Sequence, residues 1–374
     1  MNGSGSPRPA EAAPPDPLLI VGGAPRSGTT LLRNMLNAHP LIAVPGESYF
    51  ILHVFDELAS IRRTGDPVLA WDLIRRHPFF LRWDLDPGAV ESLAARHPPV
   101  TYADLIRVVF AAYAASQGKS LSVDKTPWYA MRFGILAEML PTTRFVHLLR
   151  DPREVCMSGA LQVWHKDLWA AADIWARTVA AVASVQDRLG ERLIEVRYEE
   201  LVRKPEQELR RICSHAGVEF DDAILDYPRS RGLLAGAAYR RARQPLRAGA
   251  RRWQDELSHL DIALIESRCG RLMDAAGYPR ITRGLDPRAR AIGLGRGLEQ
   301  GLEHLARVRC GAALGTRPET MPPADPDPRP WPSPSPSPGA GNAAPVLAAA
   351  DEEGAEPGPA PAGPEVRTDS VADR

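Results

Sequence analysis

The residues best suited to chemistry form the run Gly23-Ala-Pro-Arg-Ser-Gly-Thr-Thr30, which combines glycines, hydroxyl groups and one fixed positive charge. The apolar run 18–21 precedes it and leucines at helical spacing follow it, so we expect a strand, a tight loop and a helix. Such a loop lets the backbone close around an anion, and the helix N-terminus adds N–H donors. The predicted anion-binding residues are Arg26, Ser27, Gly28, Thr29 and Thr30.

The spacing of this loop resembles the nucleoside triphosphate pattern GxxxxGK[ST], but Thr29 stands where that pattern has lysine. The lysine normally reaches the β- and γ-phosphates, so its absence argues against a kinase or an ATPase. The alternative without a ligand is a plain strand-to-helix turn that uses glycine for geometry alone.

A second segment with anion-binding character runs from Arg144 to Ser158 and predicts a strand, a turn at Asp151-Pro152 and a helix. Arg150, at the strand end, can bind a phosphate through two parallel hydrogen bonds. Ser158 follows two helical turns later, within reach of the same group. An ordinary structural ion pair is the alternative for Arg150.

The loop PRSGTTLL resembles the 5′-phosphosulfate loop of sulfotransferases that use 3′-phosphoadenosine 5′-phosphosulfate (PAPS). The longer run GGAPRSGTTLLRNMLNAHP is similar to that of the tyrosylprotein sulfotransferases and their bacterial relatives. The resemblance covers roughly 18–279. It implies PAPS as cofactor and sulfuryl transfer to a hydroxyl or amine. Such a transfer requires no metal, because fixed cations can offset the charge on the leaving oxygen. The resemblance also implies that Arg150 and Ser158 bind the 3′-phosphate and that Arg26 shares in catalysis.

The same resemblance implies a general base and a leaving-group cation. Glu47 matches the glutamate that serves as base in the tyrosylprotein-type relatives, and Lys125 matches the lysine that reaches the bridging oxygen. A solvated surface glutamate and an Asp124–Lys125 surface pair are the alternatives. The cytosolic branch of the family uses a histidine, for which the sequence offers His53 and His165.

Two further cofactor contacts follow from the resemblance. Tyr198, in a Y-E-x-L segment, matches a tyrosine near the adenine, with a plain core position as the alternative. Arg247 matches a basic loop that closes on the cofactor phosphates, where Arg243 and Arg251 compete with it. The acceptor pocket is expected between 49–55 and 161–175, although the tryptophans of the second stretch fit a core equally well.

Strands and helices alternate along the chain, which predicts an α/β protein with a P-loop-like three-layer fold: a central, mainly parallel sheet flanked by helices. Beyond the first loop, the expected strands are 120–123, 144–149 and 192–196. The expected helices are 29–38, 104–116, 132–140, 153–162, 168–189 and 205–215. We expect a disordered lead at 1–17, a sulfotransferase domain at 18–280, a weakly helical extension at 281–316 and a disordered, Pro-, Ala- and Gly-rich tail at 317–374.

The composition of the chain limits which kinds of binding partner we expect. Among 374 residues, Lys+Arg and Asp+Glu both number 46, so net charge favours neither nucleic acid nor a membrane surface. The four cysteines lack metal-ligand spacing and read as reduced, buried thiols. We find neither a signal peptide nor an apolar stretch of about 20 residues, so we expect a cytoplasmic protein with no membrane span.

The expected acceptor is a small-molecule, carbohydrate or peptide hydroxyl, and the cofactor-side motifs do not distinguish among these. Two other functions remain open at this point. One is a P-loop phosphotransferase, which would need the missing lysine and a carboxylate for Mg²⁺. The other is a PAPS-binding scaffold without catalysis, with the Pro-rich tail as its docking element.

Overall fold

The computed structural model of the chain describes residues 19–158, 168–229 and 253–282, together with 242, 244, 287, 291, 292 and 295. The predicted lead at 1–17, the tail at 317–374 and almost all of the extension at 281–316 lie outside these residues. So do Arg247 and its competitors Arg243 and Arg251, and their predicted roles stay predictions.

One parallel sheet of five strands forms the centre of the described fold, in the order β2-β3-β1-β4-β5. The strands are β1 (Leu19–Gly22), β2 (Ile42–Ala43), β3 (Leu121–Lys125), β4 (Arg144–Leu149) and β5 (Leu193–Arg197). From β1 the chain first builds one side of the sheet, with β2 and β3, and then the other side, with β4 and β5, which makes the carboxyl end of β1 a topological switch point. Ligands of open α/β sheets bind at such points.

The register of the sheet brings the candidate residues to one edge. Val21 pairs with Lys125, and Gly22 pairs with His147 two residues before the end of β4. Leu149, the last residue of β4, pairs with Arg197, the last residue of β5. The loop after β1, the end of β3 and the turns after β4 and β5 therefore leave the sheet side by side.

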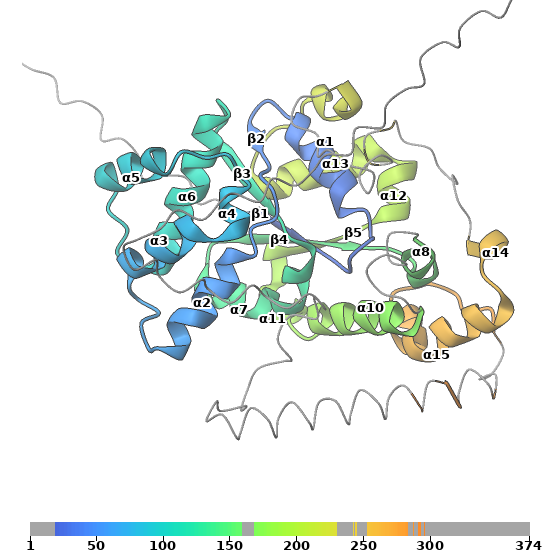
Figure 1. Cartoon of the computed structure of the whole chain (residues 1–374). Coiled ribbons are helices and arrows are strands. Elements are labelled where there is room, and N and C mark those ends of the chain that lie inside the picture. Colours follow the sequence, from blue (N-terminus) through green and yellow to red (C-terminus); the bar gives the residue numbers. More distant parts are fainter. Residues whose placement is uncertain are drawn as a thin grey trace, which may run out of the picture. The chain divides into compact units, whose positions relative to one another are not determined.

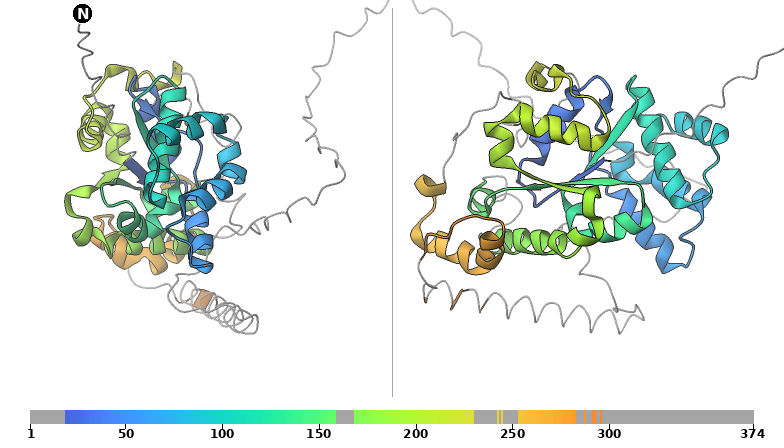
Figure 2. Two further views of the ribbon diagram at one scale, coloured as in Figure 1. Left: turned by 90° about the vertical axis from the view of Figure 1, so that its left-hand side faces the viewer. Right: turned by 180° about the vertical axis from the view of Figure 1, so that it is seen from behind.

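Helices cover both faces of this sheet (Figures 1 and 2). The helices are α1 (Thr29–Ala38), α2 (Phe50–Ser60), α3 (Pro67–Arg76), α4 (Pro78–Leu81), α5 (Pro87–Arg96), α6 (Tyr102–Ser116), α7 (Phe133–Met139), α8 (Pro152–Met157), α10 (Leu168–Ala183), α11 (Gln186–Leu189), α12 (Tyr198–Arg203), α13 (Pro205–Ala216), α14 (Trp253–Glu256) and α15 (His259–Ala275). A 3₁₀ turn, Pro127–Arg132, links β3 to α7.

Alternating strand residues feed two separate cores, as expected for a sheet covered on both faces. Leu19 and Val21 pack with α1, α12 and α13, whereas Ile20 and Phe145 pack with α2, α6 and α7. A third cluster joins Leu149 and α8 to α10 and α15. The predicted α/β class with a parallel central sheet flanked by helices is confirmed.

Several predicted boundaries need correction. Lys125, expected just after a strand, is the last residue of β3, so its side chain starts from within the sheet. The helix expected over 153–162 ends at Met157, and Ser158 is its C-cap rather than a helical residue. The single helix expected over 168–189 is broken after Ala183, where the Ser184 hydroxyl donates to the Ala181 carbonyl and competes with the helix ladder.

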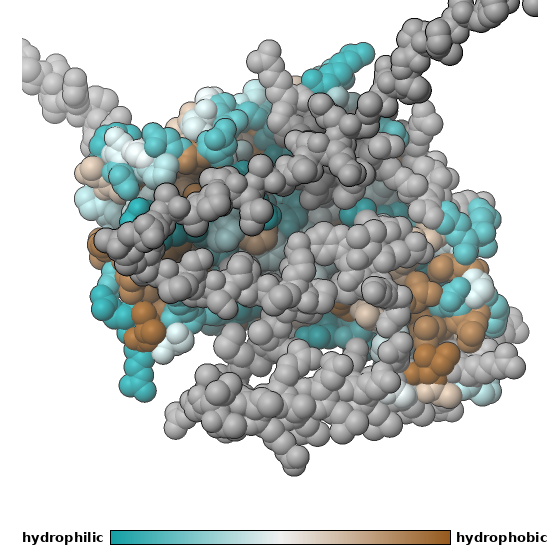
Figure 3. All heavy atoms as spheres, viewed as in Figure 1, coloured by the Kyte–Doolittle hydropathy of each residue, from teal (hydrophilic) through white to brown (hydrophobic). Residues whose placement is uncertain are grey.

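Hydrophobic residues of the described chain reach the surface in two places in Figure 3, one near α2 and α3 and one near α14 and α15. Exposed examples are Ile61 and Val68 near the first place and Leu260 on α15. Scattered apolar side chains of this kind are ordinary on protein surfaces. Among the described residues, no single helix is long and apolar enough to cross a membrane; one pair bent by 45°, Leu168–Ala183 with Gln186–Arg192, has the length and composition.

The close approach of β1 and β4 yields a stability prediction. A Cβ at Gly23 would lie 2.4 Å from the Leu148 carbonyl oxygen, and the Gly23 N–H donates to the Pro127 carbonyl. Because backbone blocks the extra methyl, Gly23→Ala should lower the free energy of unfolding by about 1–3 kcal/mol in urea denaturation. Gly65→Ala, where a Cβ meets open space, is the control and should stay within about 0.5 kcal/mol. Equal losses in both variants would contradict this explanation.

Candidate active site

The loop between β1 and α1 has a backbone shape that few residues adopt. Arg26 has φ 75° and Gly28 has φ 98°, both in the left-handed region. A Cβ at Gly28 would also lie 2.3 Å from Cδ2 of Tyr198, so the tyrosine ring packs directly on the loop backbone. Glycine is therefore required at 28 for two reasons, conformation and space. The strained position at 26 is the kind that clusters at functional sites.

The two predicted anion-binding segments meet in space. The Arg26 Nε donates to the Ser158 hydroxyl at 3.1 Å, and an Arg150 guanidinium nitrogen donates to the Arg26 carbonyl at 3.2 Å. The Arg150 guanidinium carbon lies 4.2 Å from the centre of the Tyr198 ring. The structure thus brings together four of the residues that the sequence singled out: Arg26 after β1, Arg150 after β4, Ser158 at the C-cap of α8 and Tyr198 after β5.

Buried donors at this edge fit an anionic ligand. Ser27 is 1% exposed, and its hydroxyl has no hydrogen-bond partner among the described residues. The buried Nε atom of Arg150 also has no hydrogen-bond partner among these residues. The first turn of α1 has no acidic residue, and no described side chain caps it, so its dipole faces the loop without a compensating charge. Buried polar groups of this kind normally find a partner, and phosphate or sulfate oxygens would supply one.

Glu47 and Lys125 form an ion pair across 78 residues of chain, with 2.6 Å between the Lys125 Nζ and a Glu47 carboxylate oxygen. The lysine side chain is 1% exposed and the glutamate side chain 27% exposed. The alternatives of a freely solvated glutamate and of an Asp124–Lys125 surface pair are therefore wrong. Lys125 extends from the buried strand β3, whereas the Glu47 carboxylate is partly exposed to solvent.

Behind this pair lies a buried carboxyl. Asp124 is 2% exposed, and burial raises its pKa to about 7; the Ser48 and Thr126 hydroxyls and the Lys125 charge oppose the shift, and Glu47 adds to it. The Ser48 N–H donates to the Thr126 hydroxyl at 2.9 Å. Because its pKa is raised, Asp124 holds less negative charge than an ordinary aspartate, and the Lys125 ammonium makes its ion pair with Glu47.

The other predicted site residues fall into three groups. His53, the histidine alternative for the base, stacks on Tyr49 with ring centres 5.8 Å apart inside an aromatic cluster of α2. Trp175 is fully buried and belongs to the core, whereas Trp169 is half-buried. His165 lies outside the described residues. No group of three His, Cys, Asp or Glu side chains that could hold a metal ion occurs within the described part of the chain.

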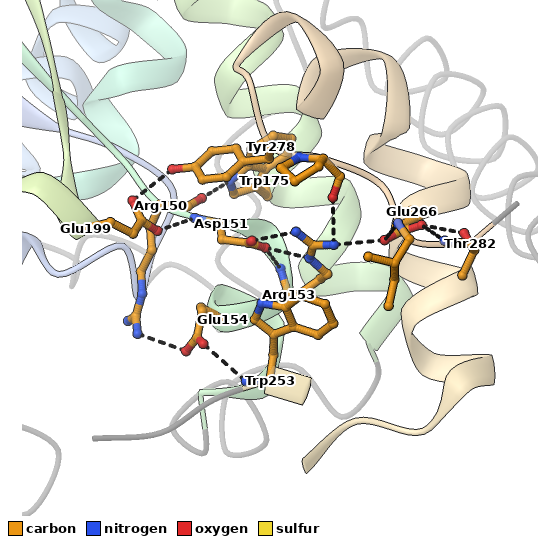
Figure 4. Close-up of polar contacts among 12 residues, drawn as sticks. Arg150, Asp151, Arg153, Glu154, Trp175, Glu199, Trp253, Glu266, Tyr278 and Thr282 are labelled. Carbon is orange, nitrogen blue, oxygen red and sulfur yellow. Dashed lines mark hydrogen bonds and ion pairs between the residues drawn. The ribbon is translucent and has the colours of Figure 1, made fainter. Parts of the chain in front are cut away.

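Sequence reasoning missed a set of charged and aromatic residues behind Arg150, drawn in Figure 4. The Asp151 carboxylate caps α8 and forms a two-point ion pair with Arg153, which is 2% exposed. The one available signal was the charge density of Arg150-Asp-Pro-Arg-Glu154, because so many neighbouring charges after a buried strand need partners. The partners lie far along the chain, in α12, α14 and α15.

Comparison with known proteins identifies the family. A family model described as "Sulfotransferase family" matches residues 17–222, more than half of the chain. The chain belongs to the sulfotransferase family. The match includes the β1 loop, Glu47, Lys125, Arg150 and Tyr198, and it ends before α14 and α15.

Curated relatives of this sulfotransferase family member carry different names. Protein-tyrosine sulfotransferase 1 of Danio rerio is 24% identical over 228 residues, which is 59% of each chain. The nodulation protein NoeE of Sinorhizobium fredii is 27% identical over 229 residues, 54% of this chain and 49% of that one. The chain thus spans about half to three fifths of the length of these relatives.

A solved structure supports the fold. The sulfotransferase domain of the Synechococcus PCC 7002 olefin synthase superposes with a TM-score of 0.51 at 24% identity, covering 72% of this chain and 97% of that domain. At this identity the likeness concerns the arrangement of sheet and helices.

The buried Asp124 predicts a dependence of stability on pH. Its unfolded pKa is 3.8 and its folded pKa is raised to about 7. Between these values the unfolded chain has lost the proton that the folded chain keeps, so the free energy of unfolding falls as pH rises, by at most about 1.4 kcal/mol per pH unit. Asp124→Asn should flatten this fall between pH 4 and 7 in urea denaturation. Asp84→Asn, at an exposed position, controls for the loss of one negative charge. An unchanged slope in Asp124→Asn would show that another group causes the dependence.

Proposed function

We propose that this protein is a sulfotransferase that moves a sulfuryl group from PAPS to a hydroxyl or amine of an acceptor, with Glu47 as general base. The observation that carries the proposal is the Lys125–Glu47 ion pair at the same sheet edge as the contact between Arg26, Ser158 and Arg150. A base, a buried cation and two anion-binding arginines are the parts that such a transfer needs.

The nucleotide would be held at two places. The loop amides and the Ser27, Thr29 and Thr30 hydroxyls face the 5′-phosphosulfate, where the α1 dipole and the left-handed Gly28 let the backbone approach it. Arg150 and Ser158 bind the 3′-phosphate. Tyr198, packed on the loop, borders the adenosine.

The chain's own residues then perform the transfer. PAPS would supply the sulfuryl group, and adenosine 3′,5′-bisphosphate would leave with the bridging oxygen on its 5′-phosphate. Glu47 accepts the proton of the acceptor hydroxyl as the new oxygen–sulfur bond forms in line with the breaking bond. Lys125 and Arg26 stabilise the negative charge that develops on the leaving phosphate oxygen as its bond to sulfur breaks. The buried Lys125 also orients the Glu47 carboxylate before the acceptor binds.

The competing functions have less support. Thr29 stands where a triphosphate-binding loop has lysine, which weighs against a phosphotransferase. A scaffold without catalysis has no need to bury a lysine against a glutamate, because burying charge is costly. The acceptor and the cytoplasmic location, both expected from the sequence, stay predictions.

Labelled donors test the reaction itself. Purified protein incubated with ³⁵S-labelled PAPS and a panel of phenols, carbohydrates and peptides should label at least one acceptor, and γ-labelled ATP should label none. Transfer from ATP alone would reject the proposal, and PAPS binding without transfer to any acceptor would favour the scaffold.

Glu47→Gln tests the base. Removing the proton acceptor should lower kcat by about 10²–10⁴-fold. Binding of adenosine 3′,5′-bisphosphate, measured by calorimetry, should change by less than about threefold, because the glutamate contacts the acceptor and not the nucleotide. An unchanged kcat would place the base elsewhere, with His53 as the next candidate.

Arg150→Ala tests the 3′-phosphate site. The variant should lose about 10–100-fold in affinity for adenosine 3′,5′-bisphosphate, the effect of losing hydrogen bonds to a charged group, and keep its affinity for 5′-AMP. Arg144→Ala is the matched control, because Arg144 is an exposed arginine at the opposite end of the same strand. Equal losses for both nucleotides in Arg150→Ala would remove the 3′-phosphate assignment.

A further inference from the structure

The peptide group that follows Arg150 is held at both of its polar ends. The Trp175 indole N–H of α10 donates to the Arg150 carbonyl at 2.9 Å, and the Asp151 N–H donates to the Glu199 carboxylate of α12 at 3.0 Å. The carbonyl and the N–H belong to the same planar unit, so fixing both sets the backbone rotation beside the Arg150 side chain. Figure 4 shows these two contacts on opposite sides of the chain.

Glu199 is in turn held by a residue from the end of the described chain. The Tyr278 hydroxyl donates to the second Glu199 oxygen at 3.0 Å, and the tyrosine is 6% exposed. The Arg197 guanidinium lies 4.7 Å from the centre of the Tyr278 ring, which fixes the ring from the β5 side. Among the described residues, one Glu199 oxygen accepts from the Asp151 N–H and the other from the Tyr278 hydroxyl.

The Arg150 side chain has a second link to the same part of the chain. Its guanidinium donates to one Glu154 oxygen at 3.2 Å, while the other Glu154 oxygen accepts the Trp253 N–H at 3.2 Å. The Glu154 carboxylate thus connects Arg150, the predicted phosphate-binding residue, to the start of α14. Burial raises the pKa of Glu154, and Arg150 opposes that shift.

Arg153, on α8, contacts residues of α15 and of the segment that follows it. It pairs with Glu266 at 2.9 Å, donates to the Pro279 carbonyl at 3.0 Å and lies 4.0 Å from the centre of the Trp253 ring. Glu266 also accepts the N–H groups of Ile281 and Thr282. Removing one partner of a pair buried this deeply is strongly destabilising. Substitution of Arg153 or Glu266 would therefore disturb the fold and would not test the contacts around Arg150 alone.

We propose that Glu199 and Tyr278 are positioning residues for Arg150, so that segment 253–282, which lies beyond the family match, is a working part of 3′-phosphate recognition. The inference rests on the proposed function, which gives Arg150 its ligand. Through hydrogen bonds between described residues, Tyr278 is linked to Arg150 by way of Glu199 and the Asp151 N–H. Neither positioning residue needs to touch the nucleotide. Their effect is to aim the guanidinium at the 3′-phosphate.

The test compares two nucleotides that differ only in the 3′-phosphate. Adenosine 3′,5′-bisphosphate and 5′-AMP are titrated by calorimetry into the full-length protein and its variants, and the ratio of their affinities is the readout. Tyr278→Phe removes one hydroxyl and should lower this ratio by about threefold to tenfold. Glu199→Gln should lower it similarly, because an amide keeps only one acceptor oxygen for its two donors.

Tyr102→Phe is the matched control. Tyr102 is also a buried tyrosine whose hydroxyl makes a hydrogen bond, to the Ile51 carbonyl at 2.8 Å, but it lies on α6. Its ratio should equal that of the wild type. A merely structural role of Tyr278 would lower the fraction of binding-competent protein and weaken both nucleotides alike.

The outcomes separate the inference from the function beneath it. If the wild type binds both nucleotides equally, the 3′-phosphate role of Arg150 is wrong. If the wild type discriminates and Tyr278→Phe discriminates as well as it does, the positioning role is wrong. A fall in the ratio for Tyr278→Phe and Glu199→Gln, with Tyr102→Phe unchanged, supports the proposal.

Discussion

Charge buried at the carboxyl edge of the parallel sheet is the constraint on which the rest of the site depends. A charge taken out of water is tolerated only with a partner and further hydrogen bonds. Lys125, 1% exposed at the end of β3, meets this demand with Glu47, and Arg153, 2% exposed after β4, meets it with Asp151 and Glu266. Glu47, before α2, and Glu266, on α15, come from other elements than the cations that they pair with, so these two pairs also fix where those elements lie.

The two halves of the site are built differently. On the Glu47 side a single ion pair reaches from the sheet interior toward solvent, which leaves the carboxylate accessible to an acceptor. On the Arg150 side the guanidinium is shared among the Glu154 carboxylate, the Arg26 carbonyl and the Tyr198 ring. The first arrangement suits a group that must exchange a proton. The second suits a group that must hold one orientation.

Local signals predicted elements well where backbone chemistry within a few residues decides the outcome. Helix α1 has the bounds that its leucine spacing predicted, Thr29–Ala38. Helices α3 and α5 were not predicted, although Asp66-Pro67 and Asp86-Pro87 combine an N-cap side chain with proline in the first turn. That signal was present in the sequence and would have placed both helix starts.

The sequence by itself determined the residue types from which the chemistry is predicted: a glycine-, hydroxyl- and Arg26-containing loop, an arginine after a strand at 150, and no triphosphate lysine. These follow from residue types and short spacings, which act through local backbone geometry. Only the tertiary structure decided that Glu47 meets Lys125 and that the Tyr278 hydroxyl and the Asp151 N–H meet on Glu199. Contacts between residues 78 or 79 positions apart depend on strand register and helix packing, and no local pattern encodes those distances.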